Sequence, residues 1–259
     1  MPDARPLILL SNDDGVAAKG LRAAREALAK HGDVIVCAPE ANQSASSHAL
    51  TLSRILRLRH VEPGVYAVDG TPADCVYVAL HAGERVLPRR PDLVVSGLNE
   101  GLNLGVDAFY SGTVAAAREA AMRGIPAVAL SADRGADRDA AAEIGARIAL
   151  EALHAHRAAG AARPFLLSVN VPPGSGWPVR ATKLGARLYS EDVDFRRDPR
   201  GGEYLWIGGA GVRHAHVAGS DTEAYDAGAV SVTPLALDLA DAAALPFTAA
   251  VVARIEAGD

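Results

Sequence analysis

Cysteine, long apolar runs and leader-like segments are scarce in this 259-residue chain. Its two cysteines, Cys37 and Cys75, each lie in an apolar run, so we expect two buried thiols and no disulfide framework. No run of about 18 apolar residues occurs, which argues against a transmembrane helix. Residues 1–6 lack the basic and apolar stretches of a signal peptide. The sequence therefore predicts a cytoplasmic protein with no membrane partner.

An excess of basic residues is also missing. The chain has 26 Lys and Arg against 31 Asp and Glu, for a formal net charge of -5. Binding to a nucleic-acid polymer requires a basic face, so we expect no such partner. A mildly acidic protein can still bind a small phosphate, because backbone N–H groups and a cation supply a local positive field.

The composition is that of an ordinary globular protein. Hydrophobic residues make up 49% and charged residues 22% of the chain, which is typical of a chain that buries a substantial core. The length fits one large α/β domain, or one such domain with an appendage.

Short apolar runs alternate with helical patterns over the first 170 residues. The patterns predict strands at residues 7–10, 34–37, 93–96, 127–130 and 166–171, and helices at residues 17–31, 71–82, 113–123 and 138–158. This alternation indicates βαβ units and a doubly wound, mostly parallel, Rossmann-like sheet. Because ligands of such sheets bind at the carboxyl ends of the strands, the loops after Leu10, Cys37, Ser96 and Leu130 should face one cleft.

The pattern changes near Lys183. Six of the twelve aromatic residues lie between positions 177 and 225, and residues 198–202 form a turn signal between two β-like runs. We therefore expect an α/β catalytic core at residues 1–182. Residues 183–259 would form an antiparallel β-hairpin arm and a C-terminal segment. The arm's aromatics fit either a satellite core under a loop or a contact with a partner protomer.

Adjacent carboxylates directly follow the first predicted strand. Asp13 and Asp14 would repel each other unless a cation lay beside them. On a continuing strand they would point to opposite faces, but a turn helped by Gly15 would let both face one site. The alternative is a solvated acidic turn in which one Asp caps the next helix.

Polar loops follow two further predicted strands at the same sheet edge. Ser44, after the second strand, offers a hydroxyl oxygen, although a plain surface loop is the alternative. The glycine-rich loop that begins at Ser96 carries Asn99, which offers a carbonyl oxygen, and Asn103, which offers an amide donor. These oxygens and the two carboxylates suit Mg²⁺, Mn²⁺ or Ca²⁺ better than a metal that prefers thiolates.

A helix N-terminus completes the set. Ser111 is a good N-cap for the helix that begins near Thr113, and the first-turn N–H groups of a helix have no partner within it. Together with the helix dipole they favour an anion such as a phosphate. Ordinary capping is the alternative reading.

Several separate motifs, in this order, resemble the SurE family of 5'/3'-nucleotidases, the survival-protein phosphatases, over about residues 7–239. They are Asn12-Asp13-Asp14-Gly15, Ala38-Pro39 with Asn42-Gln43-Ser44, Gly70-Thr71-Pro72-Ala73-Asp74-Cys75-Val76, Ser96-Gly97-Leu98-Asn99, Tyr110-Ser111-Gly112-Thr113-Val114 and Val230-Ser231-Val232-Thr233-Pro234-Leu235.

The resemblance implies specific site residues. The metal ligands would be Asp13, Asp14, Ser44 and Asn99, and the phosphate site would be lined by Asn12, Asn103, Ser111, Gly112 and Thr113. It also implies one divalent metal ion per subunit, with Mg or Mn favoured and Ca as a further bound ion. The arms would reach across protomers of a homodimer or homotetramer.

The implied activity is a 5'-nucleotidase, a phosphoric monoester hydrolase with catalytic residues Asp13 and Asp14. Its substrates would be nucleoside 5'-monophosphates, with 3'-monophosphates and short polyphosphate as further candidates. The cation would polarise a phosphoryl oxygen and lower the pKa of a bound water. His48 is a candidate general acid, and a solvated loop histidine is the alternative. A nucleotide sensor that uses the same cleft without turnover is the alternative function.

Other phosphate-handling and metal classes fit less well. A covalent aspartyl phosphatase has Asp-x-Asp after its first strand, whereas the two acids here are adjacent. The P-loop pattern and the Gly-x-Ser-x-Gly nucleophile elbow do not occur. The pairs His154 with His156 and His214 with His216 lack a companion Glu-x-x-His, so we interpret them as surface histidines and not as zinc ligands.

Overall fold

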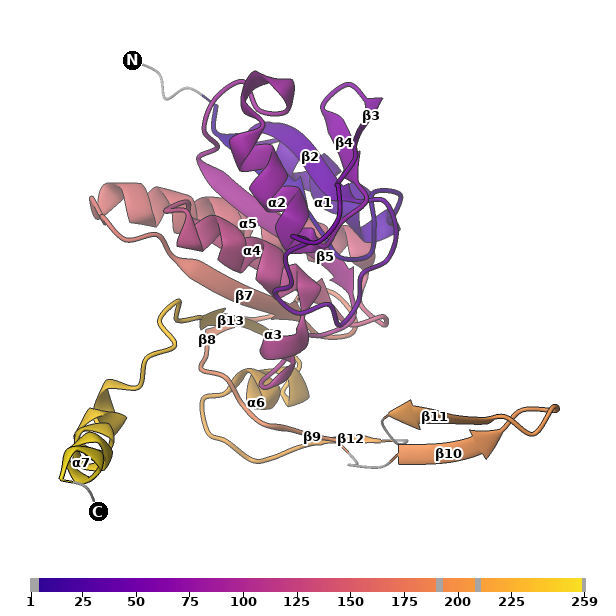
Figure 1. Cartoon of the computed structure of the whole chain (residues 1–259). Helices are drawn as coiled ribbons and strands as arrows, with labels where there is room; N and C mark the ends of the chain where they lie inside the picture. Colours follow the sequence, from indigo (N-terminus) through magenta and orange to yellow (C-terminus); the bar gives the residue numbers. More distant parts are fainter. Residues whose placement is uncertain (1–4, 190–192, 208–210, 258–259) are drawn as a thin grey trace.

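A nine-stranded sheet forms the centre of the molecule in a computed structural model that describes residues 5–189, 193–207 and 211–257. The strand order is β3-β4-β2-β1-β5-β6-β7-β13-β8. Strands β4, β2, β1, β5, β6 and β7 run parallel, whereas β3 pairs antiparallel with β4 and β13 pairs antiparallel with β7. The predicted doubly wound, mostly parallel sheet is therefore confirmed (Figure 1).

The elements follow one another along the chain as expected for βαβ units. The strands of the sheet are β1 (Leu7–Ser11), β2 (Asp33–Pro39), β3 (Leu58–Glu62), β4 (Val65–Val68), β5 (Leu93–Glu100), β6 (Ala127–Ala132), β7 (Leu166–Val171), β8 (Val179–Ala181) and β13 (Val230–Pro234). The helices are α1 (Lys19–Ala29), α2 (Pro72–His81), α3 (Asp107–Tyr110), α4 (Gly112–Met122), α5 (Arg138–Ala158), α6 (Asp221–Asp226) and α7 (Leu245–Glu256), with short 3₁₀ turns at Gly83–Arg85 and Ala242–Ala244. Within the described ranges, no helix has the length and apolar character that a membrane crossing requires.

Helices cover both faces of the sheet because its central strands are apolar on both sides. Along β1, Ile8 and Leu10 pack with α1 and α5, whereas Leu7 and Leu9 pack with α2 and α4. This alternation is the two-residue period of a strand. The result is a three-layer arrangement in which only the strand ends and the sheet edges remain open.

Local signals at the helix starts are confirmed. Thr71 caps α2 and forms a capping box with Asp74: the Asp74 N–H donates to the Thr71 hydroxyl, and the Thr71 N–H donates to the Asp74 carboxylate. Ser111 caps α4 by accepting from the N–H of Val114 at 3.0 Å. Both helices therefore begin where the sequence predicts.

The predicted antiparallel arm is present. Strands β10 (Val193–Arg197) and β11 (Glu203–Ile207) pair as a hairpin, and β9 (Arg187–Tyr189) pairs with β12 (Val212–His214) at its base. The Asp198 carboxylate accepts hydrogen bonds from the N–H groups of Arg200 and Gly202 and so closes the hairpin turn. Figure 1 shows the arm projecting from the core beside α6.

The segment after the arm returns to the core. β13 pairs antiparallel with β7 and parallel with β8, so it is an internal strand of the central sheet. Beyond it, α7 buries none of its residues and lies apart from the sheet in Figure 1. The division into residues 1–182 and 183–259 stays a prediction, and we add that residues 230–234 of the later segment belong to the sheet of the earlier one.

Candidate active site

A tight turn after β1 presents the two adjacent carboxylates at the carboxyl edge of the sheet. The side-chain amide of Asn12 donates to the Gly15 carbonyl at 3.0 Å, and the Gly15 N–H donates back to Asn12 Oδ1 at 3.3 Å. Gly15 has φ +101°, a conformation that favours glycine. The turn leaves the strand direction at once, so Asp13 and Asp14 both line one cleft.

Asp13 is buried and held by the first turn of α4. Its Oδ1 accepts from the Thr113 hydroxyl at 2.6 Å, and its Oδ2 accepts from the Thr113 N–H at 3.1 Å. Burial raises the pKa of Asp13, and the charge of Asp14 raises it further, although the bonds from Thr113 oppose the shift. The net cost of ionising Asp13 is what a nearby cation would remove.

Asp14 lies on the cleft side of the same turn and is half-buried. It accepts from the Glu100 N–H at 3.1 Å and from the Asn42 side-chain amide at 3.3 Å. Burial raises the pKa of Asp14, and the negative charge of Glu100 adds to this, whereas the charge of Arg134 lowers it. Asp14 is thus a carboxylate that a ligand in the cleft can reach.

Two neutral oxygen donors come from the neighbouring strand ends. The β5–β6 pairing shifts register between Ser96 and Asn99, and such an irregularity re-aims side chains near a site. Asn99 donates its amide N–H to the Gly101 carbonyl at 2.9 Å, and no donor in the described chain reaches its Oδ1. Ser44 follows β2, is exposed and lines the cleft.

All four residues predicted as metal ligands line the same cleft, whose volume is about 1100 Å³. They are Asp13, Asp14, Ser44 and Asn99, and Asn103 and Ser111 of the predicted phosphate site line it too. The gathering occurs because the loops after β1, β2 and β5 leave the same edge of a parallel sheet.

The donor set fits a hard divalent cation. It consists of two carboxylates, a hydroxyl and an amide carbonyl, which are all oxygen ligands. Among the described residues, no group of three or more His, Cys, Asp or Glu side chains is arranged to hold a metal. A thiolate or histidine metal is therefore a poor fit, whereas a cation that keeps several waters needs only one or two carboxylates.

The N-terminus of α4 lies against Asp13. The Thr113 and Val114 N–H groups are used by Asp13 and Ser111. The N–H of Gly112 meets no acceptor within the described ranges, and a Cβ at Gly112 would lie 2.9 Å from the Asp13 Cβ. Gly112 is therefore packed against Asp13, and it is not among the described residues that line the cleft. Asn12 and Thr113 likewise contact the turn and Asp13 instead of lining the cleft, and the role of all three residues in phosphate binding stays a prediction.

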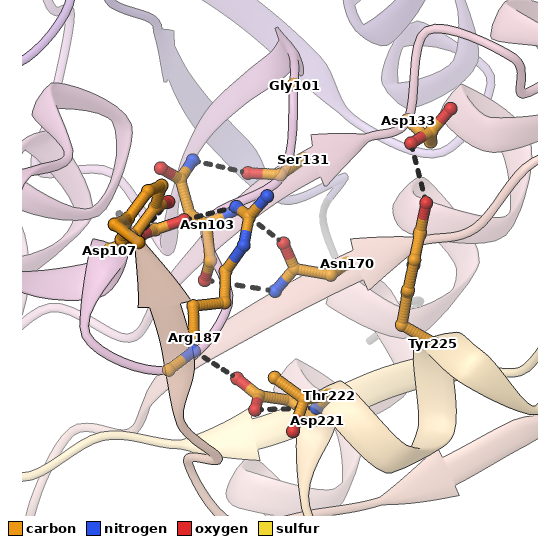
Figure 2. Close-up of polar contacts among 12 residues, drawn as sticks. Gly101, Asn103, Asp107, Ser131, Asp133, Asn170, Arg187, Asp221, Thr222 and Tyr225 are labelled. Carbon is orange, nitrogen blue, oxygen red and sulfur yellow. Dashed lines mark hydrogen bonds and ion pairs between the residues drawn. The ribbon is translucent and has the colours of Figure 1, made fainter. Parts of the chain in front are cut away.

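A buried network positions the loop that carries Asn103 (Figure 2). The Asn103 side-chain amide donates to Ser131 Oγ at 2.7 Å, and its backbone N–H donates to Asn170 Oδ1 at 2.8 Å. Asp221, fully buried on α6, accepts from the Gly105 N–H at 2.9 Å. One N–H of the Asn103 amide is used by Ser131, and Asn103 remains among the residues that line the cleft.

Sequence reasoning did not identify Arg134, Ser131, Asn170 or Asp221. Arg134 follows β6 and lines the cleft, and its positive charge lowers the pKa of Asp14. The prediction that the loop after Leu130 faces the cleft was the available signal, but it did not single out a residue. The other three are polar residues in apolar strands or at a helix start, and their partners are more than 25 positions away in sequence.

His48, the speculative general acid, lies in a different cavity from Asp13 and Asp14. Its Nε2 is 2.8 Å from Oε2 of the buried Glu119, which also pairs with Arg123. Burial raises the pKa of Glu119, but the bonds from His48 and Arg123 together lower it. We therefore assign His48 no catalytic role.

Comparison with known proteins gives consistent matches. A model of the family described as survival protein SurE matches residues 8–191. The 5'-nucleotidase SurE of Sorangium cellulosum (strain So ce56) is 72% identical over 238 residues, covering 91% of each chain. The protein of the same name from Anaeromyxobacter dehalogenans (strain 2CP-C) is 50% identical over 236 residues, covering 89% of this chain and 90% of the relative. The crystal structure of the SurE protein from Aquifex aeolicus superposes with a TM-score of 0.77 at 36% identity, covering 93% and 97% of the two chains.

Proposed function

The chain belongs to the SurE family of survival proteins, and from this premise and the geometry of the cleft we propose that it is a metal-dependent 5'-nucleotidase. It is a phosphoric monoester hydrolase that converts nucleoside 5'-monophosphates to nucleoside and phosphate. The single observation that carries the assignment of the site is that Asp13, Asp14, Ser44 and Asn99 line one cleft beside the N-terminus of α4.

Asp13, Asp14, Ser44 and Asn99 would hold one divalent cation, Mg²⁺ or Mn²⁺ with Ca²⁺ as a further bound ion, and the cation would polarise a phosphoryl oxygen and make attack by water easier. The fit rests on the all-oxygen donor set and on two carboxylates whose pKa values burial raises. Such a pair is stabilised by a nearby positive charge.

The chain's own groups would orient the phosphate. The N–H of Gly112 belongs to the first turn of α4, where the helix dipole favours an anion. Ser111 and Asn103 line the same cleft as the two carboxylates. Arg134 lines the cleft as well and would add a positive charge near Asp14. Donors fixed before the substrate arrives are the groups that stabilise charge as it develops in the transition state.

Asp14 is the better placed of the two carboxylates to accept a proton from the attacking water. It is half-exposed in the cleft, whereas Asp13 is buried and both of its oxygens are bonded to Thr113. We assign Asp13 to holding the cation and the start of α4 together.

The proposal extends to three properties of the working enzyme. Nucleoside 3'-monophosphates and short polyphosphate are further candidate substrates. A homodimer or homotetramer is proposed because the arm exposes Phe195 and Trp206, which are 60% and 63% exposed. A cytoplasmic location is proposed from the sequence alone.

The test is phosphate release from a panel of substrates. The panel contains nucleoside 5'- and 3'-monophosphates and short polyphosphate, each assayed with Mg²⁺, Mn²⁺ or chelator. We expect metal-dependent release that is fastest from 5'-monophosphates. Binding of nucleotide without release under any metal would instead support a sensor that uses the same cleft.

A further inference from the structure

The cleft has two chemically different ends. Its polar end contains Asp13, Asp14 and Arg134. Its opposite end is bounded by the base of the hairpin arm, where Tyr189, Ile207 and Val212 form an apolar wall. A nucleoside monophosphate has the same division, with a dianionic phosphate at one end and a flat, weakly polar base at the other.

We propose that the arm side of the cleft is a nucleobase subsite and that the ring of Tyr189 is its stacking platform. The inference rests on the proposed function for the position of the phosphate. It adds that the base is bound by the arm, a segment that lies between β8 and β13 in the sequence and outside the catalytic motifs. A cleft of about 1100 Å³ has room for a whole mononucleotide.

Tyr189 is held in place before any ligand binds. Its hydroxyl donates to Asp107 Oδ1 at 2.5 Å, and the guanidinium carbon of Arg187 lies 5.5 Å from the centroid of its ring. Arg187 also pairs with Asp107, in the cluster that Figure 2 shows beside Asn103. A tyrosine ring that is held through its hydroxyl and packed by Arg187 loses little conformational entropy when it stacks on a ligand.

The fixed ring is also accessible and uncharged. Tyr189 remains 45% exposed although its hydroxyl is bonded. Burial, followed by the bond to Asp107, raises the pKa of Tyr189 to about 12, so the phenol stays neutral near pH 7. Asp107 belongs to α3, which directly precedes the N-cap Ser111 of α4. The same short helix therefore connects the stacking platform to the phosphate end of the cleft.

The test compares a substrate with a base and one without. We would measure kcat/KM for adenosine 5'-monophosphate and for ribose 5-phosphate, and take their ratio. Base–aromatic stacking is typically strong enough that its loss changes binding by about tenfold. Tyr189→Leu should therefore lower the ratio about tenfold, whereas Tyr189→Phe, which keeps the ring, should keep most of it.

Two further variants make the result specific. Tyr204 lies on β11 with 43% of its surface exposed but does not line the cleft. Tyr204→Leu is therefore the matched control and should leave the ratio unchanged. Ile207→Ser, at a wall residue that is 86% exposed and so cannot disturb the core, should lower the ratio about threefold. An unchanged ratio in both Tyr189→Leu and Ile207→Ser would overturn the subsite.

A binding measurement separates the subsite from the reaction. Adenosine would be titrated into the full chain in chelator, with calorimetry as the readout. Weaker adenosine binding by Tyr189→Leu than by the wild-type protein supports the subsite even if no phosphate is released from any substrate, in which case only the proposed hydrolysis falls. Equal binding by the two proteins, with hydrolysis intact, contradicts the subsite and leaves the proposed function standing.

Discussion

Asp13→Asn should make the metal-free protein more stable while destroying its activity. Asp13 is 4% exposed, and burial is the largest influence on its raised pKa. A carboxylate whose pKa is raised by folding is one whose charge the folded state disfavours. An amide of the same shape removes that charge. It can still accept from the Thr113 N–H and donate to the Thr113 hydroxyl.

The change in the free energy of unfolding caused by Asp13→Asn follows from two opposed contributions. Exchanging two charge-assisted hydrogen bonds for neutral ones loses about 1 kcal/mol each. Removing a buried charge regains several kcal/mol in principle. Because the pKa is raised, the second contribution is the larger. We expect a net gain of about 1–2 kcal/mol in the free energy of unfolding, or roughly 2–8 °C in Tm for a chain of this size.

The pH dependence of the stability difference tests independently whether the charge of Asp13 destabilises the folded protein. The folded-state pKa of Asp13 lies above its ordinary value of 3.8, so between these values the folded protein binds more protons than the unfolded one. Stability contributed by Asp13 is therefore lost as pH rises through the folded pKa. The advantage of Asp13→Asn over wild type in chelator should be full at pH 7 and should shrink as pH is lowered.

Thermal unfolding with and without metal completes the experiment. A cation present at 100 times its Kd stabilises the wild-type protein by about 2.7 kcal/mol, so millimolar Mn²⁺ should reverse the order of the two Tm values. Asp33→Asn, at an exposed position that pairs with Arg5 at 3.4 Å, is the control. It should leave the Tm unchanged both in chelator and in Mn²⁺. The reasoning is refuted if Asp13→Asn is the less stable protein in chelator at pH 7.

Three further predictions concern the cleft. Because burial raises the pKa of Asp13 and Asp14, protons compete with the cation for these carboxylates. The Mn²⁺ concentration that gives half-maximal rate should therefore rise as pH falls from 7 toward 5. A concentration that does not change with pH would contradict this. Asn170→Ala removes the acceptor of the Asn103 N–H. It should lower kcat about tenfold and leave the Mn²⁺ affinity, measured by calorimetry, unchanged. A raised KM with unchanged kcat would argue against a positioning role. Arg134→Gln removes the positive charge of a side chain that lines the cleft. It should lower kcat/KM for the dianionic substrate about three- to tenfold and weaken the salt dependence of the rate. An unchanged salt dependence would remove Arg134 from the site.

The parts of the fold that local signals encode were predicted correctly from the sequence. β1, with five buried residues, is recognisable as a buried strand because residues 7–10 form an uninterrupted apolar run. Thr71 and Ser111 mark helix starts because the cap and its partner lie within four residues of each other. The common position of Asp14, Ser44 and Asn99 follows from a rule about parallel strands, which needs no knowledge of side-chain packing.

Features that depend on distant pairing were not predictable in the same way. β13 enters the sheet between β7 and β8, a position decided by which backbone edge is free once the core has formed. The bond from the Asn103 amide to Ser131, 28 residues away, has no local signal in the sequence, and the role of Asn103 in phosphate binding stays a prediction. Arg134 is one of 26 basic residues, and only its place beside Asp14 distinguishes it.

Initial rates of phosphate release from adenosine 5'-monophosphate, measured for the wild-type protein and Asp14→Asn across a Mn²⁺ titration, test the central claim most directly. We expect the wild-type rate to rise with Mn²⁺ and to vanish in chelator. We expect Asp14→Asn to fall at least 100-fold while keeping its fold by circular dichroism. A wild-type rate that ignores chelator, or an Asp14→Asn variant that keeps more than a tenth of the activity, would contradict a metal-dependent nucleotidase centred on this carboxylate pair.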